Sequence, residues 1–366
     1  MAEKIADRKL VLQNGLEFLG CGFGAQRDSI SEIVFNTSMV GYQEIVSDPS
    51  YTDQAIVMSY PLIGNYGITD DDFESSSMLL GGLIVREYND LPSNFRYTKT
   101  LGELMEERGV PGISGVDTRM LVRAIRDHGS MKAIMTDAKC DTNAALDMLN
   151  AYQLRRDQVK RAGCKKRWYL RTQHPRYSVA VIDCGVKRGI LTSLLNRGCN
   201  LTILPHTVAA DELLKLRPDG VLLSNGPGDP KDVPEVIELI KSIRGKLPIF
   251  GICLGHQLCC LAYGAKTFKL KFGHRGGNHP VRRLDNNKIE ITSQNHSYAV
   301  AADSVVGTRL KITHLNLLDQ TVEGVSCESD NLFSVQYHPE SAPGPQDSRY
   351  LFDRFISMME GEKHNA

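Results

Sequence analysis

The chain has 366 residues, enough for two domains that each bury a core. Its 43 basic and 43 acidic residues cancel, which leaves no global field for nucleic acid, and no apolar run has the length of a signal core or membrane span. The nine cysteines form no CxxC pair, so we expect a cytoplasmic protein with reduced thiols that binds neither nucleic acid nor membrane.

Residues 1–150 mix short strand-like runs with glycine-marked turns and two helix-like runs. Apolar spacing predicts a helix over Thr118–His128, with Asp117 as its N-cap. These patterns predict an N-terminal α+β, β-rich domain. The strand-like runs are Lys9–Gln13, Glu32–Asn36, Gln54–Ser59 and Met78–Glu87, and the other helix-like run is Thr100–Arg108.

Residues 151–177 carry a dense group of cations with little periodicity. Only two aromatic residues, Trp168 and Tyr169, are interleaved with the charge. A solvated linker or a strip that contacts a partner fits this pattern better than a nucleic-acid site does. The cations are Lys160, Arg161, Lys165, Lys166, Arg167, Arg171 and Arg176.

From residue 178 to about residue 360, strand-like and helix-like segments alternate. Apolar strands that alternate with helices predict an α/β domain with a doubly wound, mostly parallel sheet. A terminal helix is expected over Ser348–Glu360. The strands are expected at Ser178–Asp183, Leu201–Leu204, Val221–Ser224 and Ile249–Ile252, and helices between them at Gly189–Asn196 and Pro234–Arg244.

The run Pro248–Gln257 indicates a strand, a tight turn and a helix, with Cys253 at the tip of the turn. This is the pattern of a nucleophile elbow, with sulfur as the nucleophile. Gly251 and Gly255 leave room for strained backbone and close helix packing. A helix N-terminus and a nearby histidine both favour the thiolate.

A base for this thiol is expected from His338, which follows a strand-like run and precedes a proline. Residues two apart in an extended chain share a face, so Glu340 can reach the ring of His338. Such a carboxylate fixes the imidazole tautomer and stabilises the imidazolium.

The turn Asn225–Pro230 follows another strand and places backbone N–H groups at the carboxyl end of the sheet. Pro227 has no N–H, so Gly226 and Gly228 are the donors there. Together with the N–H of Leu254 they are candidates for an oxyanion hole.

These three motifs together resemble the triad-type (class I) glutamine amidotransferases. Motifs of the N-terminal half resemble one branch of that group, the carbamoyl-phosphate synthetase small subunits, and the likeness spans nearly the whole chain. The motifs are Phe35–Glu44, Ser47–Tyr51, Tyr60–Gly67, Gly115–Arg119, Phe272–Pro280 and Ser293–His296.

The resemblance implies a role for each motif residue. Cys253 would be the nucleophile, His338 the base and Glu340 its orienter, while Leu254 and Gly226 would supply the oxyanion N–H groups. Ser38 would join the glutamine site from the other domain, so that the pocket would lie at the domain junction. The implied glutamine pocket consists of Ser38, Gly226, Gly228, Leu254, Gln257, Asn295, Ser297 and Tyr298.

Three features depart from the family pattern. Ser297 replaces the usual glycine, Cys184 and Gly189 replace an aromatic residue and an asparagine, and residues 151–177 follow no recognised pattern.

No metal site is expected, because the spacing of His274 and His279 with the adjacent Cys259 and Cys260 matches no zinc pattern.

The implied activity is glutamine hydrolysis, with ammonia channelled to a large subunit that makes carbamoyl phosphate from bicarbonate and two ATP, for arginine or pyrimidine synthesis. This chain has no GxxxxGK[ST] motif, so we expect no cofactor on it, and ATP and divalent metal on the large subunit. Two alternatives stay open at this stage: an amidotransferase subunit of another synthetase, and a catalytically silent regulatory scaffold.

Overall fold

The computed structural model describes residues 6–365 and divides by its contacts into two units. The first unit runs to Arg155 and also takes in Lys271–Arg275. The second unit holds Arg156–Leu270 and the chain from Gly276 onward. None of the helices in the described part of the chain combines the length and the apolar character needed to cross a bilayer.

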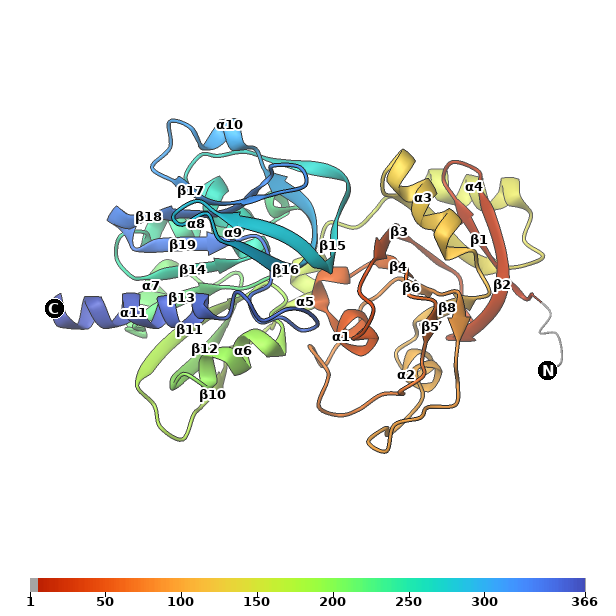
Figure 1. The fold of residues 1–366 in the computed structure, drawn as a ribbon, viewed down its shortest axis with the longest axis horizontal. Coiled ribbons are helices and arrows are strands. Elements are labelled where there is room, and N and C mark those ends of the chain that lie inside the picture. The colour runs from red at the N-terminus through yellow and green to blue at the C-terminus, as the bar shows by residue number, and fades with distance from the viewer. Residues whose placement is uncertain (1–5, 366) are drawn as a thin grey trace. The chain divides into compact units, whose positions relative to one another are not determined.

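A closed barrel forms the core of the first unit (Figure 1). Neighbours along β4 alternate between two apolar clusters, because Ile56 and Met58 enter one cluster while Ala55 and Val57 enter the other. Both faces of this strand are therefore buried. In barrel order the strands are β1 (Arg8–Leu12), β2 (Glu17–Gly24), β8 (Pro111–Ser114), β6 (Gly82–Ile84), β4 (Gln54–Met58), β3 (Ser29–Asn36) and β9 (Met131–Asp137).

Helix ends in this unit follow the capping residues. The Asp117 side chain accepts a hydrogen bond from the N–H of Met120, as predicted, and Thr100 and Glu103 form a reciprocal capping box. The remaining elements are α1 (Tyr42–Ser47), η1 (Pro49–Tyr51), β5 (Leu62–Ile63), β7 (Glu87–Tyr88), α2 (Leu101–Glu107), α3 (Thr118–His128) and α4 (Thr142–Ala151).

The strand predicted over Met78–Glu87 is much shorter in the structure, where β6 covers only Gly82–Ile84. Asp53, opposite this segment, has a positive φ of 62°, and its N–H donates to the Leu79 carbonyl outside the regular ladder. Regular pairing with β4 therefore starts only at Ala55 and Gly82.

A ten-stranded mixed sheet forms the core of the second unit (Figure 1). Its middle strands β12, β11, β13, β14 and β19 are parallel neighbours, and the others are antiparallel where their pairing is given. In sheet order the strands are β10 (Trp168–Leu170), β12 (Cys199–Pro205), β11 (Tyr177–Asp183), β13 (Gly220–Leu223), β14 (Ile249–Ile252), β19 (Leu332–Val335), β18 (Val322–Cys327), β16 (Ile289–Val300), β15 (Thr267–Arg283) and β17 (Lys311–Asn316).

Side chains of the parallel strands belong to two separate apolar clusters. Ile182 and Leu223 pack in a cluster with α8 and α9, whereas Val181 and Leu222 pack in a cluster with α6 and α11. Continuous apolar strands of this kind are the pattern that predicted an α/β domain, and a mixed α/β fold is what the structure shows. The helices are α5 (Gln158–Ala162), α6 (Arg188–Leu195), α7 (Ala210–Lys215), η2 (Pro230–Asp232), α8 (Pro234–Ile243), α9 (Leu254–Ala262), α10 (Ala302–Val305), η3 (Glu328–Asp330) and α11 (Tyr350–Asn365).

Two segments differ from the sequence-based division of the chain. The segment 151–177 is not a linker throughout, because it contains α5 and the strand β10, which pairs antiparallel with β12. Lys271–Arg275 groups with the first unit, where Phe272 packs on the Phe35 ring and the Arg275 carbonyl accepts a hydrogen bond from Thr37. No sequence pattern marks the helix and strand within residues 151–177, and none marks the grouping of Lys271–Arg275 with the first unit.

Candidate active site

Cys253 lies at a sharp turn between β14 and α9, as the elbow pattern predicts. Its backbone has φ 53° and ψ −103°, outside the regions that non-glycine residues prefer. The Cys253 N–H donates to the carbonyl of Val335 over 2.9 Å, which helps to hold this turn against β19. The side chain is almost fully buried, and its Sγ lies 3.6 Å from the carbonyl oxygen of Asn295.

The glycines on either side of Cys253 are required by close packing. A Cβ on Gly255 would lie 2.3 Å from the Leu223 carbonyl oxygen, and one on Gly251 would lie 2.8 Å from the Gly255 carbonyl oxygen. Both contacts are with backbone atoms that cannot move aside cheaply. Only glycine therefore lets α9 start this close to β13.

His338 and Glu340 follow β19 and form the pair that their spacing predicts. The His338 Nδ1 lies 2.7 Å from Glu340 Oε1, and both side chains are almost completely buried. The His338 N–H donates to the carbonyl of Ser293, so the segment is held on β16 as well. This geometry fixes the ring and directs its other nitrogen, Nε2, away from the carboxylate.

Lys187 is a site residue that the motif analysis missed. Its Nζ lies 2.9 Å from Glu340 Oε1 and also donates to the carbonyl of Ala342 over 2.7 Å. The backbone N–H of Lys187 donates to Asn225 Oδ1, and this hydrogen bond connects the start of α6 to the turn after β13. A lysine shortly after the end of a predicted strand could have been noted in the sequence. The sequence does not show, however, which carboxylate this lysine contacts.

The charges in this group shift the pKa values of both triad partners. Burial opposes ionisation of Glu340, but the neighbouring Lys187 and His338 outweigh it and hold the pKa of Glu340 well below its usual range. Burial also works against the charged form of His338, but Glu340 and the sulfur of Cys253 raise the pKa of His338 to about 10. At neutral pH His338 therefore carries a proton that it can give to a leaving amine.

The turn after β13 contacts the nucleophile turn directly. A Cβ on Gly226 would lie 2.8 Å from Leu254 Cδ2 and 2.4 Å from the Cys184 carbonyl oxygen. The Leu254 side chain thus packs against Gly226, and the role of their N–H groups as an oxyanion hole stays a prediction. Gly228 lies further along the same turn, exposed and with a positive φ of 88°.

Gln257 lies one helical turn after Cys253, and its side-chain amide nitrogen donates two hydrogen bonds within the protein. Its Nε2 donates to the Tyr298 carbonyl over 2.8 Å and to Gln336 Oε1 over 3.0 Å. Both Nε2 protons are used within the protein, so only Oε1 can face a ligand. An acceptor in this position suits an ammonium group.

Asn295, Ser297 and Tyr298 all lie on β16, beside the turn that carries Cys253. Asn295 presents its carbonyl oxygen to the sulfur, and Tyr298 presents its carbonyl oxygen to Gln257. Ser297 is half-buried between them.

Ser38 lies in the first unit, just after β3. Its N–H donates to Asn36 Oδ1, and it lines a cavity of about 120 Å³ with Met39, Tyr42 and Tyr66, among others. Its predicted place in the glutamine site stays a prediction.

A second cysteine–histidine pair in the same helix does not match a nucleophile and its base. Cys260 Sγ lies 4.0 Å from His256 Nε2, and the other ring nitrogen of His256 lies 2.9 Å from Ser334 Oγ. Burial and the nearby His314 lower the pKa of His256 to about 3, and burial raises the pKa of Cys260. His256 is too weak a base, and the pKa of the Cys260 thiol too high, for the two side chains to act as a catalytic pair.

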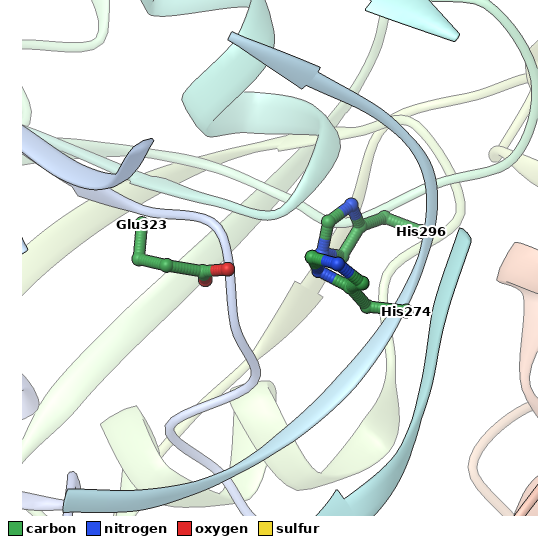
Figure 2. Close-up of side chains that lie close together, drawn as sticks. All are labelled: His274, His296 and Glu323. Carbon is green, nitrogen blue, oxygen red and sulfur yellow. The ribbon is translucent and has the colours of Figure 1, made fainter. Parts of the chain in front are cut away.

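His296 on β16 and Glu323 on β18 are drawn in Figure 2 together with His274. Both ring nitrogens of His296 have partners, since Nδ1 lies 2.7 Å from the Tyr298 carbonyl oxygen and Nε2 lies 3.0 Å from Gln294 Oε1. Glu323 Oε1 accepts a hydrogen bond from Asn316. One ligand atom from each of His274, His296 and Glu323 lies within 4.8 Å of the others, so a metal ion bound there would have to replace one of these contacts of His296.

Comparison with known proteins identifies the family. Residues 180–358 match the family described as glutamine amidotransferase class-I, and residues 10–135 match the one described as carbamoyl-phosphate synthase small chain, CPSase domain. The carbamoyl phosphate synthase small chain of Oceanobacillus iheyensis is 50% identical over 356 residues, which cover 97% of each chain. The chain belongs to the carbamoyl phosphate synthase small chain family.

Other small chains match over a similar length. The carbamoyl phosphate synthase small chain of Listeria innocua is 50% identical over 361 residues, covering 98% of this chain and 99% of that one. The carbamoyl phosphate synthase pyrimidine-specific small chain of Bacillus subtilis is 50% identical over 353 residues, covering 96% of each.

Gln336 is a second residue that motif analysis did not assign, and it gives a testable prediction. It is fully buried and its Oε1 accepts from Gln257, so Gln336→Met removes one hydrogen bond at similar volume. One such bond is worth about 0.5–1.5 kcal/mol, or a two- to tenfold change in affinity. We expect KM for glutamine to rise by about that factor while kcat changes less. A parallel fall in kcat with unchanged KM would contradict this positioning role.

The pKa of His338 gives a second prediction. Because that pKa is raised to about 10, the stabilising His338–Glu340 interaction is complete below the ordinary histidine pKa and is lost as pH rises through about 10. Glutamine hydrolysis should lose activity over the same alkaline range. In Glu340→Gln the alkaline limb should move to lower pH, because the charge that raises the pKa is gone. A pH profile of kcat/KM whose alkaline limb is identical in both proteins would rule this out.

Proposed function

We propose that this chain is the glutaminase subunit of a carbamoyl phosphate synthase. The observation that carries the proposal is the strained turn at Cys253, whose side chain forms a hydrogen bond with His338, with Glu340 and Lys187 buried behind the ring. A nucleophile, an acid–base group and its orienter in this order are the parts needed for acyl transfer.

The chemistry begins at the side-chain amide of glutamine. The Cys253 thiolate attacks the amide carbon, and the oxygen that gains charge is held by the N–H groups of Leu254 and Gly226. His338 gives its proton to the departing nitrogen, so that the carbon–nitrogen bond breaks and ammonia leaves. A γ-glutamyl thioester remains on Cys253.

Hydrolysis of the thioester completes the cycle. His338, now neutral, accepts a proton from water, and the hydroxide attacks the thioester carbon. Glutamate leaves, its carboxyl proton passes to solvent, and the thiolate and the imidazolium are restored. Gln257 Oε1 binds the α-ammonium of the substrate in this scheme, and Asn295, Ser297, Tyr298, Gly228 and Ser38 complete the glutamine site.

Ammonia released into water at neutral pH becomes ammonium, which is not a nucleophile. The proposed partner is therefore a large chain that receives ammonia directly and makes carbamoyl phosphate from bicarbonate and two ATP, with ATP and divalent metal bound there. The match of residues 10–135 to a domain described for small chains of this synthase supports this partner over another synthetase. The product would serve arginine or pyrimidine synthesis.

Two finer points belong to the same proposal. The separate apolar clusters on either side of β11 and β13 support a doubly wound arrangement of the second unit. All nine cysteines are free in the structure, which supports a reducing, cytoplasmic location.

The proposal is tested by labelling with a chloromethyl ketone analogue of glutamine. We expect mass spectrometry to find one label on Cys253, and excess glutamine to slow the labelling. Labelling of another cysteine, or labelling that glutamine does not affect, would leave the chain as a silent scaffold.

A further inference from the structure

An uncompensated basic group lies at one margin of the second unit's sheet. Residues 158–182 contain seven lysines and arginines and no aspartate or glutamate, in a chain whose total charge is zero. Six exposed residues in and around β10 are here called the basic edge. They are Lys165, Lys166, Arg167, Trp168, Tyr169 and Arg171.

The basic edge belongs to a strand with one free side. β10 is the terminal strand of the sheet and pairs with β12 alone, through Trp168 opposite Ile203, Tyr169 opposite Thr202 and Leu170 opposite Leu201 (Figure 1). The other side of β10 therefore presents backbone N–H and C=O groups that no strand of this sheet uses. Such a margin is a template for a further strand.

The cations of the basic edge are not neutralised within the part of the chain that the structure describes. Arg176, nearby, pairs with Glu360 over 3.0 Å, but Lys165, Lys166, Arg167 and Arg171 have no acidic partner among the side chains described, those of residues 6–361. The facing residues of β12 are Leu201, Thr202 and Ile203, which carry no charge. The positive charge is thus available to a partner.

The aromatic residues argue against a purely protective role. Lysines alone suffice to keep a sheet edge from pairing with other chains. Here Trp168 and Tyr169 are consecutive in a strand, so they point to opposite faces, and yet they are 37% and 50% exposed. The Arg167 guanidinium lies 5.6 Å from the centre of the Tyr169 ring. Exposed tryptophan, tyrosine and arginine together are typical of binding surfaces.

We propose that the basic edge binds an acidic, extended segment of the large chain, which adds to β10 as a further strand. The identity of this partner rests on the function proposed above. Backbone pairing with the free side of β10 would provide register, and the four cations would attract and hold carboxylates. A free strand margin alternates N–H and C=O groups and so matches another peptide strand, whereas a nucleic acid offers no such alternation.

The experiment uses Trp168, the only tryptophan of the chain, as its probe. The full chain is labelled with 5-fluorotryptophan, which gives a single ¹⁹F resonance from the basic edge. The unlabelled large chain is added at low salt and again at about 0.5 M salt, and complex formation is followed separately by sedimentation. The variant is Lys165→Glu with Arg167→Glu. The matched control is Lys246→Glu with Lys311→Glu, which makes the same charge change at exposed sites elsewhere in the unit.

We expect the resonance to shift or broaden when the complex forms, and the Kd to rise at least tenfold in the basic-edge variant but not in the control. Glutamine hydrolysis by the isolated variant should remain normal. If the complex forms and the resonance does not change, the basic edge is not the interface and this inference fails while the proposed function stands. If no complex forms at all, both fail. A change on adding single-stranded RNA, with none on adding the large chain, would assign the surface to nucleic acid instead.

Discussion

Cys253→Ala should abolish glutamine-dependent synthesis of carbamoyl phosphate in the complex with the large chain, while synthesis from added ammonia continues. The substitution removes the sulfur that forms the thioester and leaves the helix and its packing intact. Loss of a nucleophile of this kind lowers turnover by roughly 10⁴-fold or more. The measurement is the rate of carbamoyl phosphate formation with glutamine and with ammonium chloride as alternative nitrogen sources.

Cys260→Ala is the matched control for this experiment. It removes a buried thiol from the same helix, and that thiol has only the weakly basic His256 beside it. We expect nearly normal glutamine-dependent synthesis, with some loss of stability from the cavity. Glutamine-dependent synthesis that survives in Cys253→Ala would remove the thioester mechanism from consideration.

Lys187→Met should lower both the stability of the chain and its rate of glutamine hydrolysis. Lys187 and Glu340 form an ion pair whose side chains are 3% and 0% exposed. Removing one member of a buried pair costs about 3–5 kcal/mol when the other charge is left alone. His338 still lies 2.7 Å from Glu340 in this variant, so we expect a loss towards the lower end of that range. The carboxylate that orients His338 is then also harder to keep ionised. Thermal unfolding and steady-state kinetics measure the two effects separately.

The double variant Lys187→Met with Glu340→Gln separates stability from catalysis. With both charges of the Lys187–Glu340 pair gone, neither is left buried without the other, so we expect much of the stability to return. Activity should not return, because His338 then has no carboxylate beside Nδ1. If Lys187→Met unfolds at the same temperature as the unmodified chain, the Lys187–Glu340 pair does not contribute to stability as predicted.

Local patterns in the sequence predicted the elements well where a single cause decides them. The helix Thr118–His128 and its Asp117 cap are as predicted, and β14 has the predicted bounds. Closure of the first unit into a barrel was not foreseen, because it depends on pairings such as β1 with β9 that join residues far apart in the chain. Gly20–Gly24, which superficially resembles a dinucleotide loop, is part of β2, where Gly20 approaches the Ser114 carbonyl.

The site was foreseen only where motif spacing carries the geometry. The spacing of His338 and Glu340 is sufficient to predict their contact, and the glycines around Cys253 predict the tight turn. Lys187 and Gln336 act through residues on other elements, and neither partner is close in sequence. Such partners are set by the packing of α6 and α9 on the sheet, which no local pattern encodes.

The most direct test of the whole account is glutaminase activity of the chain alone and then with the large chain, ATP and bicarbonate. We expect strong stimulation, with carbamoyl phosphate formed in step with glutamate. Glutamate release that the large chain does not stimulate, and that yields no carbamoyl phosphate, would contradict the assigned partnership. The chemistry at Cys253 and His338 would then have to serve a different synthetase.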